Sequence, residues 1–145
     1  IDEMDSVEEA AASATKSIVQ ATATNKREEI ANFAKTFVGG RYIYGGTNPY
    51  IGADCSGFVK YILANAAGVS LPRTSSEQST RGTTVASADQ LQPGDLLFYG
   101  SGRSVSHVAM YIGDGKVVHA SSSRTGIIIS NYNYRPVIRM ANVIG

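Results

Sequence analysis

Hydrophobic positions recur at helical spacing in the first half of the chain. Between residues 28 and 37 the apolar side chains stand three and four positions apart, which is the spacing of one helix face. These positions are Ile30, Phe33, Ala34 and Phe37. Asn25 and Glu28 form a capping box at the start of this predicted helix, and Gly39 and Gly40 predict its end.

A second helix is predicted over residues 55–67, "CSGFVKYILANAA". Its apolar face carries Phe58, Ile62 and Ala66, with Val59 and Leu63 beside them. Asp54 is a suitable N-cap because its carboxylate can accept hydrogen bonds from the free N–H groups of the first turn. Gly68 fits the end of the helix. This helix therefore begins at Cys55, the one cysteine of the chain.

From residue 95 onward, short apolar or alternating runs are separated by Gly-rich turns, which predicts about five strands. The runs are "DLLFYG", "HVAMYIGDG", "KVVHASS", "GIIISNY" and "PVIRMANVIG". The "GDG" of residues 113–115 predicts a tight hairpin between two of them. Helices followed by such a meander predict an α+β fold, with N-terminal helices packed on a mostly antiparallel sheet.

The connecting stretches are richer in Gly, Pro and polar residues. Residues 41–54, "RYIYGGTNPYIGAD", predict a short extended segment followed by a loop. Residues 69–94 predict loops with one short helix near Ser76 to Thr80.

Composition and charge narrow the class of protein. The 145 residues fit one domain, and a 43% hydrophobic content with a net charge of +1 is typical of a globular protein without a strongly basic nucleic-acid-binding surface. No apolar stretch is long enough for a membrane span. Residues 1–25, rich in Ala and Thr, predict an extra helix or a linker from further domains N-terminal to it.

Cys55 raises the first question of chemistry. A lone cysteine cannot form an internal disulfide, so its thiol is either a buried apolar group or a reactive one. The partial positive charge of a helix N-terminus lowers a thiol pKa, and the N–H of Cys55 could point into an oxyanion site. Gly57 would let backbone or substrate approach closely. Position alone leaves both interpretations open.

The chain has two histidines, His107 and His119, and both fall on strands joined by the "GDG" turn. Residues directly opposite on such strands lie about 5 Å apart, so one imidazole could take the thiol proton while the other orients it. Each histidine alone could equally be a semi-buried structural residue. With Cys55 they could also hold zinc, but close-spaced pairs such as C-x-x-C are missing, so we expect no metal and no cofactor. Phosphate-binding and nucleic-acid-binding motifs are missing too.

Four motifs in order, "YIYGG", "DCSGF", "QPGDLLFY" and "SHVAMYIGDGKVVHASS", resemble the NlpC-type cysteine peptidases of bacterial cell walls. The resemblance covers about residues 27–144 and implies a papain-like catalytic domain over residues 26–145. It implies hydrolysis of peptidoglycan stem peptides between D-γ-glutamate and meso-diaminopimelate or lysine, through a thioester at Cys55. It also implies a secreted or wall-associated bacterial protein.

The resemblance further implies roles for individual residues. Cys55 matches the nucleophile, His107 the general base, His119 the residue that orients it, and Tyr42 the hydroxyl of the oxyanion site. Asp54, Ser56, Arg73 and Ser75 match positions at the substrate pocket. For Asp54, helix capping is the competing interpretation. The stretch "HASSSRTG" departs from the "HAP" of many relatives, so the specificity of that loop stays open.

Two other functions are compatible with these residues. One is a papain-like amidase that cuts between the lactyl group of the sugar and L-Ala. The other is a catalytically silent wall-binding domain that keeps the triad residues in a blocked cleft.

Overall fold

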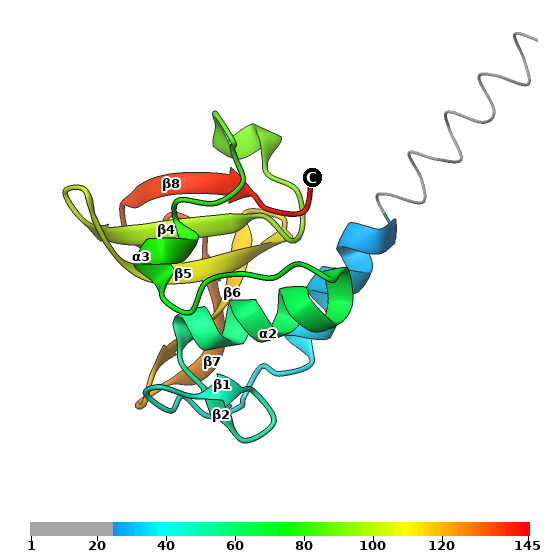
Figure 1. Cartoon of the computed structure of the whole chain (residues 1–145), viewed down its shortest axis with the longest axis vertical. Helices are drawn as coiled ribbons and strands as arrows, with labels where there is room; N and C mark the ends of the chain where they lie inside the picture. The colour runs from blue at the N-terminus through cyan, green and yellow to red at the C-terminus, as the bar shows by residue number, and fades with distance from the viewer. Residues whose placement is uncertain (1–24) are drawn as a thin grey trace, which may run out of the picture.

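A computed structural model describes residues 25–145 of the chain, so the linker or helix expected at the N-terminus lies almost wholly outside it. The first helix covers residues 25–35, and the capping box expected at Asn25 falls at the border of the described part. The other elements are β1 (Thr47–Asn48), β2 (Gly52–Ala53), α2 (Cys55–Ala67), α3 (Ser75–Gln78), β3 (Thr83–Thr84), the 3₁₀ turn η1 (Ala88–Gln90), β4 (Leu96–Ser101), β5 (Ser104–Gly113), β6 (Lys116–Ser122), β7 (Gly126–Asn131) and β8 (Val137–Asn142) (Figure 1).

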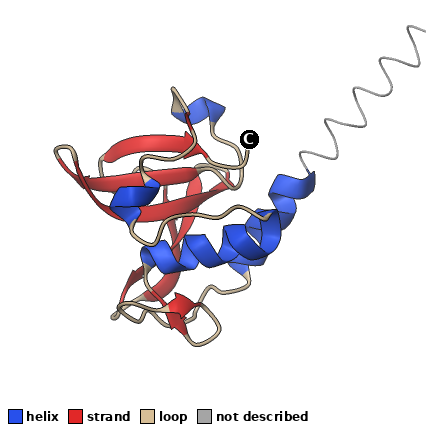
Figure 2. Cartoon of the chain, viewed as in Figure 1, coloured by secondary structure: helices blue, strands red, loops and turns tan. Residues whose placement is uncertain are grey.

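The main sheet has six antiparallel strands in the order β3-β8-β4-β5-β6-β7. The five expected strands are all present as β4 to β8. The sixth, β3, was not expected because a two-residue edge strand is too short to show a pattern. Figure 2 shows the strands of the main sheet in one curved layer, with the two long helices beside it and the short β1–β2 hairpin apart from it. The α+β prediction is confirmed.

Helix α2 forms as its sequence predicts. The Asp54 carboxylate accepts a 2.8 Å hydrogen bond from the N–H of Gly57, and Gly68 ends the helix in the left-handed conformation with φ 66°. A Cβ atom on Gly57 would lie 2.1 Å from the carbonyl oxygen of Gly46. Only glycine therefore lets the first turn of α2 pack this closely against the loop before β1.

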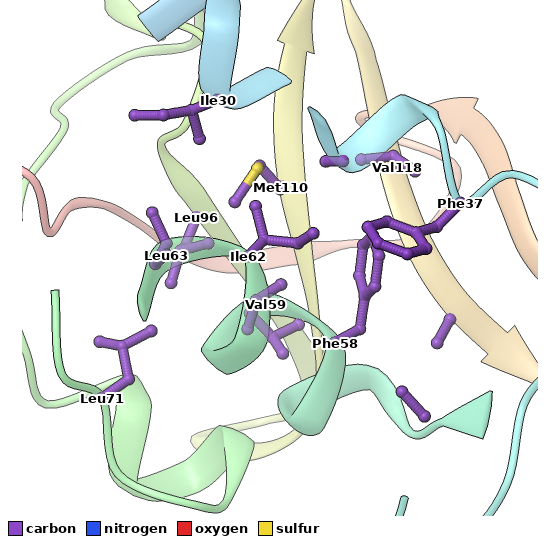
Figure 3. Packing of buried hydrophobic residues seen from close by; sticks show 14 of the residues in the cluster. Ile30, Phe37, Phe58, Val59, Ile62, Leu63, Leu71, Leu96, Met110 and Val118 are labelled. Carbon is purple, nitrogen blue, oxygen red and sulfur yellow. The ribbon is translucent and has the colours of Figure 1, made fainter. Parts of the chain in front are cut away.

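The hydrophobic core fixes α2 on the sheet. Figure 3 shows its buried side chains meeting those of the strands and of the first helix. The helix contributes Phe58, Val59, Ile62 and Leu63, and the sheet contributes Leu96, Met110 and Val118, all fully buried. Burying one such side chain contributes roughly 1.5–3 kcal/mol. Cys55 is thus held at the end of a firmly anchored helix.

The first helix is tied to the sheet by a buried ion pair. Arg27 Nη1 lies 3.0 Å from Asp95 Oδ1 and also donates to the carbonyl of Pro93. Arg27 Nη2 donates to the side chain of Asn142 in β8. One guanidinium therefore joins the first helix to the end of the sheet where β4 begins and β8 ends.

Residues 41–54 differ from the prediction. The "RYIYGG" segment is not a regular strand, while the expected loop contains the short β1–β2 hairpin. The segment is still paired, since Ala53 donates to the carbonyl of Arg41 and the N–H of Ile43 donates to Ala53. A Cβ atom on Gly46 would lie 2.3 Å from the carbonyl oxygen of Gly52. The close approach of Gly46 and Gly52 allows the narrow β1–β2 hairpin. The alternation of polar and apolar side chains along the sequence does not reveal it.

The predicted hairpin between the histidine-bearing strands is confirmed. Gly113 pairs with Lys116, which leaves Asp114 and Gly115 as a two-residue loop with φ values of 53° and 72°. Positive φ at both central positions is the type I′ geometry that suits twisted strands. The short helix expected near Ser76 is present as α3.

Candidate active site

Most of the predicted site residues line one pocket of about 370 Å³ at the start of α2. Its walls come from Tyr42, Tyr44, Gly45, Asp54, Cys55, Ser56, Arg73, Thr74, Ser75 and Ser106. The capped start of α2 supplies Cys55, the loop before β1 supplies Tyr42, and the segment before α3 supplies Arg73. Segments far apart in the chain therefore meet around the thiol.

His107 and His119 do not line this pocket but lie beside it. Ser106 lines the pocket, and the backbone N–H of Val108 lies close enough to the Cys55 thiol to favour its thiolate form. The backbone pairing of β5 with β6 begins at Met110, so residues 104–109 of β5 are not paired with β6. His107 pairs with Tyr99 of β4 and stands in the chain between Ser106, which lines the pocket, and Val108, whose N–H lies near the thiol.

The two imidazoles are hydrogen-bonded to each other and to a serine. His107 Nε2 lies 2.8 Å from His119 Nδ1, and His119 Nε2 lies 2.9 Å from Ser130 Oγ. The pairing of Met110 with Val118 makes the histidines diagonal neighbours rather than directly opposite residues. Their ring centroids are still 5.0 Å apart.

This chain of contacts gives each ring nitrogen one role. Because Nε2 of His107 is engaged with His119, Nδ1 is the nitrogen left to accept a proton. Neutral His107 then carries its proton on Nε2 and donates to His119, which in turn donates from its own Nε2 to Ser130. Ser130, on β7, was missed by the sequence analysis. Its polar side chain after the apolar run "GIII" was the available signal.

Aromatic rings enclose the histidines. The Tyr134 ring lies 5.1 Å from that of His119, and the Tyr99 ring lies 6.0 Å from that of His107. His119 is fully buried and His107 is 7% exposed. Burial lowers the pKa of His107 to about 3, assisted by the charges of His119 and Arg135. Burial likewise lowers the pKa of His119 to about 4, so both rings are neutral at neutral pH.

The surroundings of Cys55 correct one prediction. Burial raises the pKa of the Cys55 thiol, and the Asp54 carboxylate raises it further. The N–H groups of Val108 and Ser56 favour the thiolate but do not outweigh the burial. The lowered pKa expected from the helix N-terminus is therefore wrong. The resting site holds a neutral thiol beside neutral imidazoles, and the thiol must lose its proton as it reacts.

Tyr42 has the properties of a hydrogen-bond donor in the pocket. Burial raises the pKa of its phenol, and the neighbouring Cys55 and Asp54 raise it further. The hydroxyl therefore keeps its proton. No hydrogen bond from this hydroxyl is found within residues 25–145, so the donor is available to a ligand.

Asp54 is already occupied by several donors. Arg73 binds it with both terminal nitrogens, at 2.8 Å and 3.1 Å, and Gly45 and Gly57 donate their N–H groups. Burial raises the pKa of Asp54, but the hydrogen bonds from Arg73 and Gly57 outweigh it and hold the pKa below its usual value. The capping interpretation is confirmed, and the charge of Asp54 is balanced by Arg73.

Ser56 and Ser75 occupy more enclosed positions. Arg73 Nη1 donates to Ser56 Oγ at 2.9 Å, and both serines are buried. Buried Gln78 in α3 donates to the carbonyls of Ser56 and Pro72, at 3.1 Å and 2.9 Å. This amide ties the first turn of α2 to the segment that carries Arg73.

Neither a metal-binding cluster nor a membrane helix is found in this part of the chain. Among residues 25–145, no three His, Cys, Asp or Glu side chains are grouped to hold a metal ion. No helix in the same range is both long and apolar enough to cross a membrane.

Lowering the pH from 6.5 to 5 is expected to reduce the free energy of unfolding by about 3 kcal/mol. In the unfolded chain both histidines take up a proton as the pH falls below their ordinary pKa of 6.5. In the folded protein the pKa of His119 is about 4 and the pKa of His107 is about 3, so both stay neutral at pH 5. Stability is therefore lost as the pH falls through this window. Urea unfolding at several pH values measures the slope, and a constant stability between pH 6.5 and 5 would contradict it.

Comparison with known proteins connects this geometry to a family. The model of the NlpC/P60 family matches residues 39–141. The chain is 40% identical over 116 residues to the gamma-DL-glutamyl hydrolase of Bacillus subtilis, covering 77% of this chain and 27% of that protein. It is 40% identical over 114 residues to the gamma-D-glutamyl-L-lysine dipeptidyl-peptidase of Bacillus cereus, covering 76% and 33%. The chain thus spans a third or less of these relatives.

Solved structures agree. An NlpC/P60 family protein from Bacillus cereus has a TM-score of 0.74 at 34% identity, over 82% of this chain and 40% of that chain. The NlpC/p60 domain of the peptidoglycan hydrolase SagA has a TM-score of 0.70 at 30% identity, over 78% of this chain and 95% of that chain.

Proposed function

The chain belongs to the NlpC/P60 family of peptidoglycan hydrolases. We propose that it is a cysteine endopeptidase that cuts peptidoglycan stem peptides between D-γ-glutamate and the diamino acid. The observation that carries the proposal is the thiol of Cys55 in an open pocket, beside the hydrogen-bonded chain of His107, His119 and Ser130. The γ-glutamyl bond named for two relatives supports the choice of bond.

The first half of the reaction forms a thioester. The Cys55 sulfur attacks the γ-glutamyl carbonyl carbon while the thiol proton passes to Nδ1 of His107. The carbonyl electrons move onto oxygen, where the hydroxyl of Tyr42 and the free N–H of Cys55 stabilise the charge. The C–N bond then breaks, and the departing amine of the diamino acid takes the proton from His107.

The second half releases the product. A water molecule attacks the thioester carbonyl while His107 accepts one of its protons, and the C–S bond breaks to give a carboxylic acid, which loses its remaining proton to solvent. The proton on His107 returns to the Cys55 sulfur. His119 and Ser130 hold the His107 ring so that the same nitrogen faces the reaction in both halves.

The Cys55 thiol and the His107 imidazole are both neutral at rest. This supports general-base catalysis rather than a preformed thiolate–imidazolium ion pair. A buried imidazole with a low pKa is a weak base in isolation. Proton transfer to it becomes favourable as the sulfur bonds to carbon, because the developing oxyanion balances the imidazolium charge. The Tyr42 hydroxyl is therefore part of the step that moves the proton.

Peptidoglycan lies outside the cytoplasmic membrane, so this function requires export. We propose that the protein acts as a secreted or wall-associated hydrolase whose catalytic part is joined to further domains. Its partner is the stem peptide, and neither nucleic acid nor a cofactor takes part. Cell fractionation with an antibody against residues 26–145 tests the location, and a wholly cytoplasmic pool would contradict it.

Digestion of defined muropeptides is expected to release fragments that begin with the diamino acid and to leave L-Ala-γ-D-Glu on the sugar. Mass spectrometry of the products identifies the bond. An amidase would instead free the whole peptide from the lactyl group, and a silent binding domain would leave the muropeptide intact. Either result would overturn the proposal. The Cys55→Ala protein is the control for contaminating hydrolases.

A further inference from the structure

A second pocket adjoins the one that holds Cys55. It has a volume of about 450 Å³ and is lined by Gly40, Arg41, Tyr42, Ile43, Ser123, Arg124, Thr125 and Gly126. Tyr42 lines both pockets. A peptide that crosses Tyr42 therefore extends from the thiol into the second pocket.

The second pocket is positively charged. Arg41 and Arg124 both line it and are exposed, and no carboxylate is among its lining residues. Within residues 25–145 neither guanidinium forms an ion pair, because the ion pairs found there belong to Arg27 and Arg73. The pocket of Cys55 differs, since its Arg73 is balanced by Asp54.

The walls of this pocket are braced by the backbone. Gly39 and Gly40 pair with Ile127 of β7 through two hydrogen bonds of 3.0 Å. A Cβ atom on Gly126, which has φ +70°, would lie 2.3 Å from the carbonyl oxygen of Gly40. Glycine thus brings the β6–β7 turn against the segment of Arg41, and both lie at the same end of the molecule (Figure 1).

The β6–β7 turn is itself ordered by side chains. Ser122 Oγ lies 3.1 Å from Thr125 Oγ1, and the N–H of Thr125 donates to Ser122. The turn is formed by the stretch "SSSRT" of residues 121–125. Arg124 is therefore presented from a defined turn rather than from a loose loop.

We propose that the pocket of Arg41 and Arg124 binds a carboxylate of the diamino acid on the leaving side of the scissile bond. The inference rests on the proposed function, which puts the acyl part of the stem in the Cys55 pocket. Guanidinium groups pair with carboxylates through charge-assisted hydrogen bonds. Diaminopimelate carries a distal carboxylate that lysine lacks, so the pocket selects stems with a free acid at that position.

The test compares two peptides that differ by one charge. They are L-Ala-γ-D-Glu-meso-diaminopimelate and the same peptide with its distal carboxylate amidated. The wild-type protein is expected to hydrolyse the free acid with a kcat/KM roughly tenfold higher, the effect of one charge-assisted hydrogen bond. Arg124→Gln and Arg41→Gln are each expected to bring this ratio toward one. Arg103→Gln, the same change in the exposed β4–β5 turn, is the control and leaves the ratio as in the wild type.

Two results would overturn the inference: a wild-type ratio near one, or a ratio that persists in both pocket variants. A binding measurement separates this outcome from failure of the proposed function. Titration of the Cys55→Ala protein with the two peptides, followed by amide NMR, is expected to shift the signals of residues 123–126 and to show tighter binding of the free acid. Equal affinities for the two peptides would refute the carboxylate site even if neither peptide is hydrolysed.

Discussion

Cys55→Ala is expected to abolish hydrolysis of muropeptides, lowering kcat by at least about 10⁴-fold. The substitution removes the only sulfur nucleophile of the chain, and no other cysteine can replace it. Residual catalysis from the oxyanion site and from substrate binding is small without a covalent intermediate. Release of diamino-acid fragments, followed by mass spectrometry over hours, measures the loss.

The fold is expected to survive this change. Cys55 is partly exposed at the first position of α2, and the helix cap depends on the Asp54 side chain rather than on the thiol. Urea unfolding should therefore give a stability within about 1 kcal/mol of the wild type. Activity above about 1% of the wild type in a folded Cys55→Ala protein would refute the nucleophile assignment.

Alkylation of the wild-type protein gives an independent measure of the same thiol. Since burial raises the pKa of Cys55, its reaction with iodoacetamide should speed up through the alkaline range rather than level off near neutral pH. One label per chain is the maximum, because there is one cysteine.

The elements with a strong pattern were predictable from the sequence. Helix α2 has both caps and an uninterrupted apolar face, and β4 to β8 are short apolar or alternating runs separated by turns. The β1–β2 hairpin was missed because it depends on a close glycine contact between Gly46 and Gly52. That contact involves backbone atoms only, so the side-chain pattern contains no trace of it.

The candidate site was predictable only in part. The order of the motifs predicted the positions of Cys55, Tyr42 and the two histidines. The pKa shifts of the thiol and the imidazoles depend on burial in the folded protein, which the local sequence does not reveal. A helix N-terminus favours a thiolate, yet the desolvation of Cys55 outweighs it. Ser130 reaches His119 from a neighbouring strand, and Tyr134 covers it from the segment before β8. Such contacts depend on how the sheet brings strands together.

Tyr42→Phe is expected to lower kcat by about 10²–10³-fold, equivalent to the loss of roughly 2.7–4 kcal/mol of transition-state stabilisation. The ring stays in place, but the hydroxyl that would bind the oxyanion is gone. Its raised pKa keeps it protonated, so a donor rather than a phenolate is removed. Because the hydroxyl bonds to no other group among residues 25–145, the free energy of unfolding should change little.

Tyr50→Phe is the matched control. Tyr50 also carries a phenol in the β1–β2 hairpin region, but it is 70% exposed, packs against Phe37 at 4.7 Å between ring centroids, and does not line either pocket. Its kcat should equal that of the wild type. Initial rates at saturating peptide separate kcat from KM, since an oxyanion donor acts in the transition state and a substrate contact acts mainly on KM. A Tyr42→Phe protein with normal kcat and a raised KM would make Tyr42 a substrate contact, and the Cys55 N–H would then be left as the main oxyanion donor.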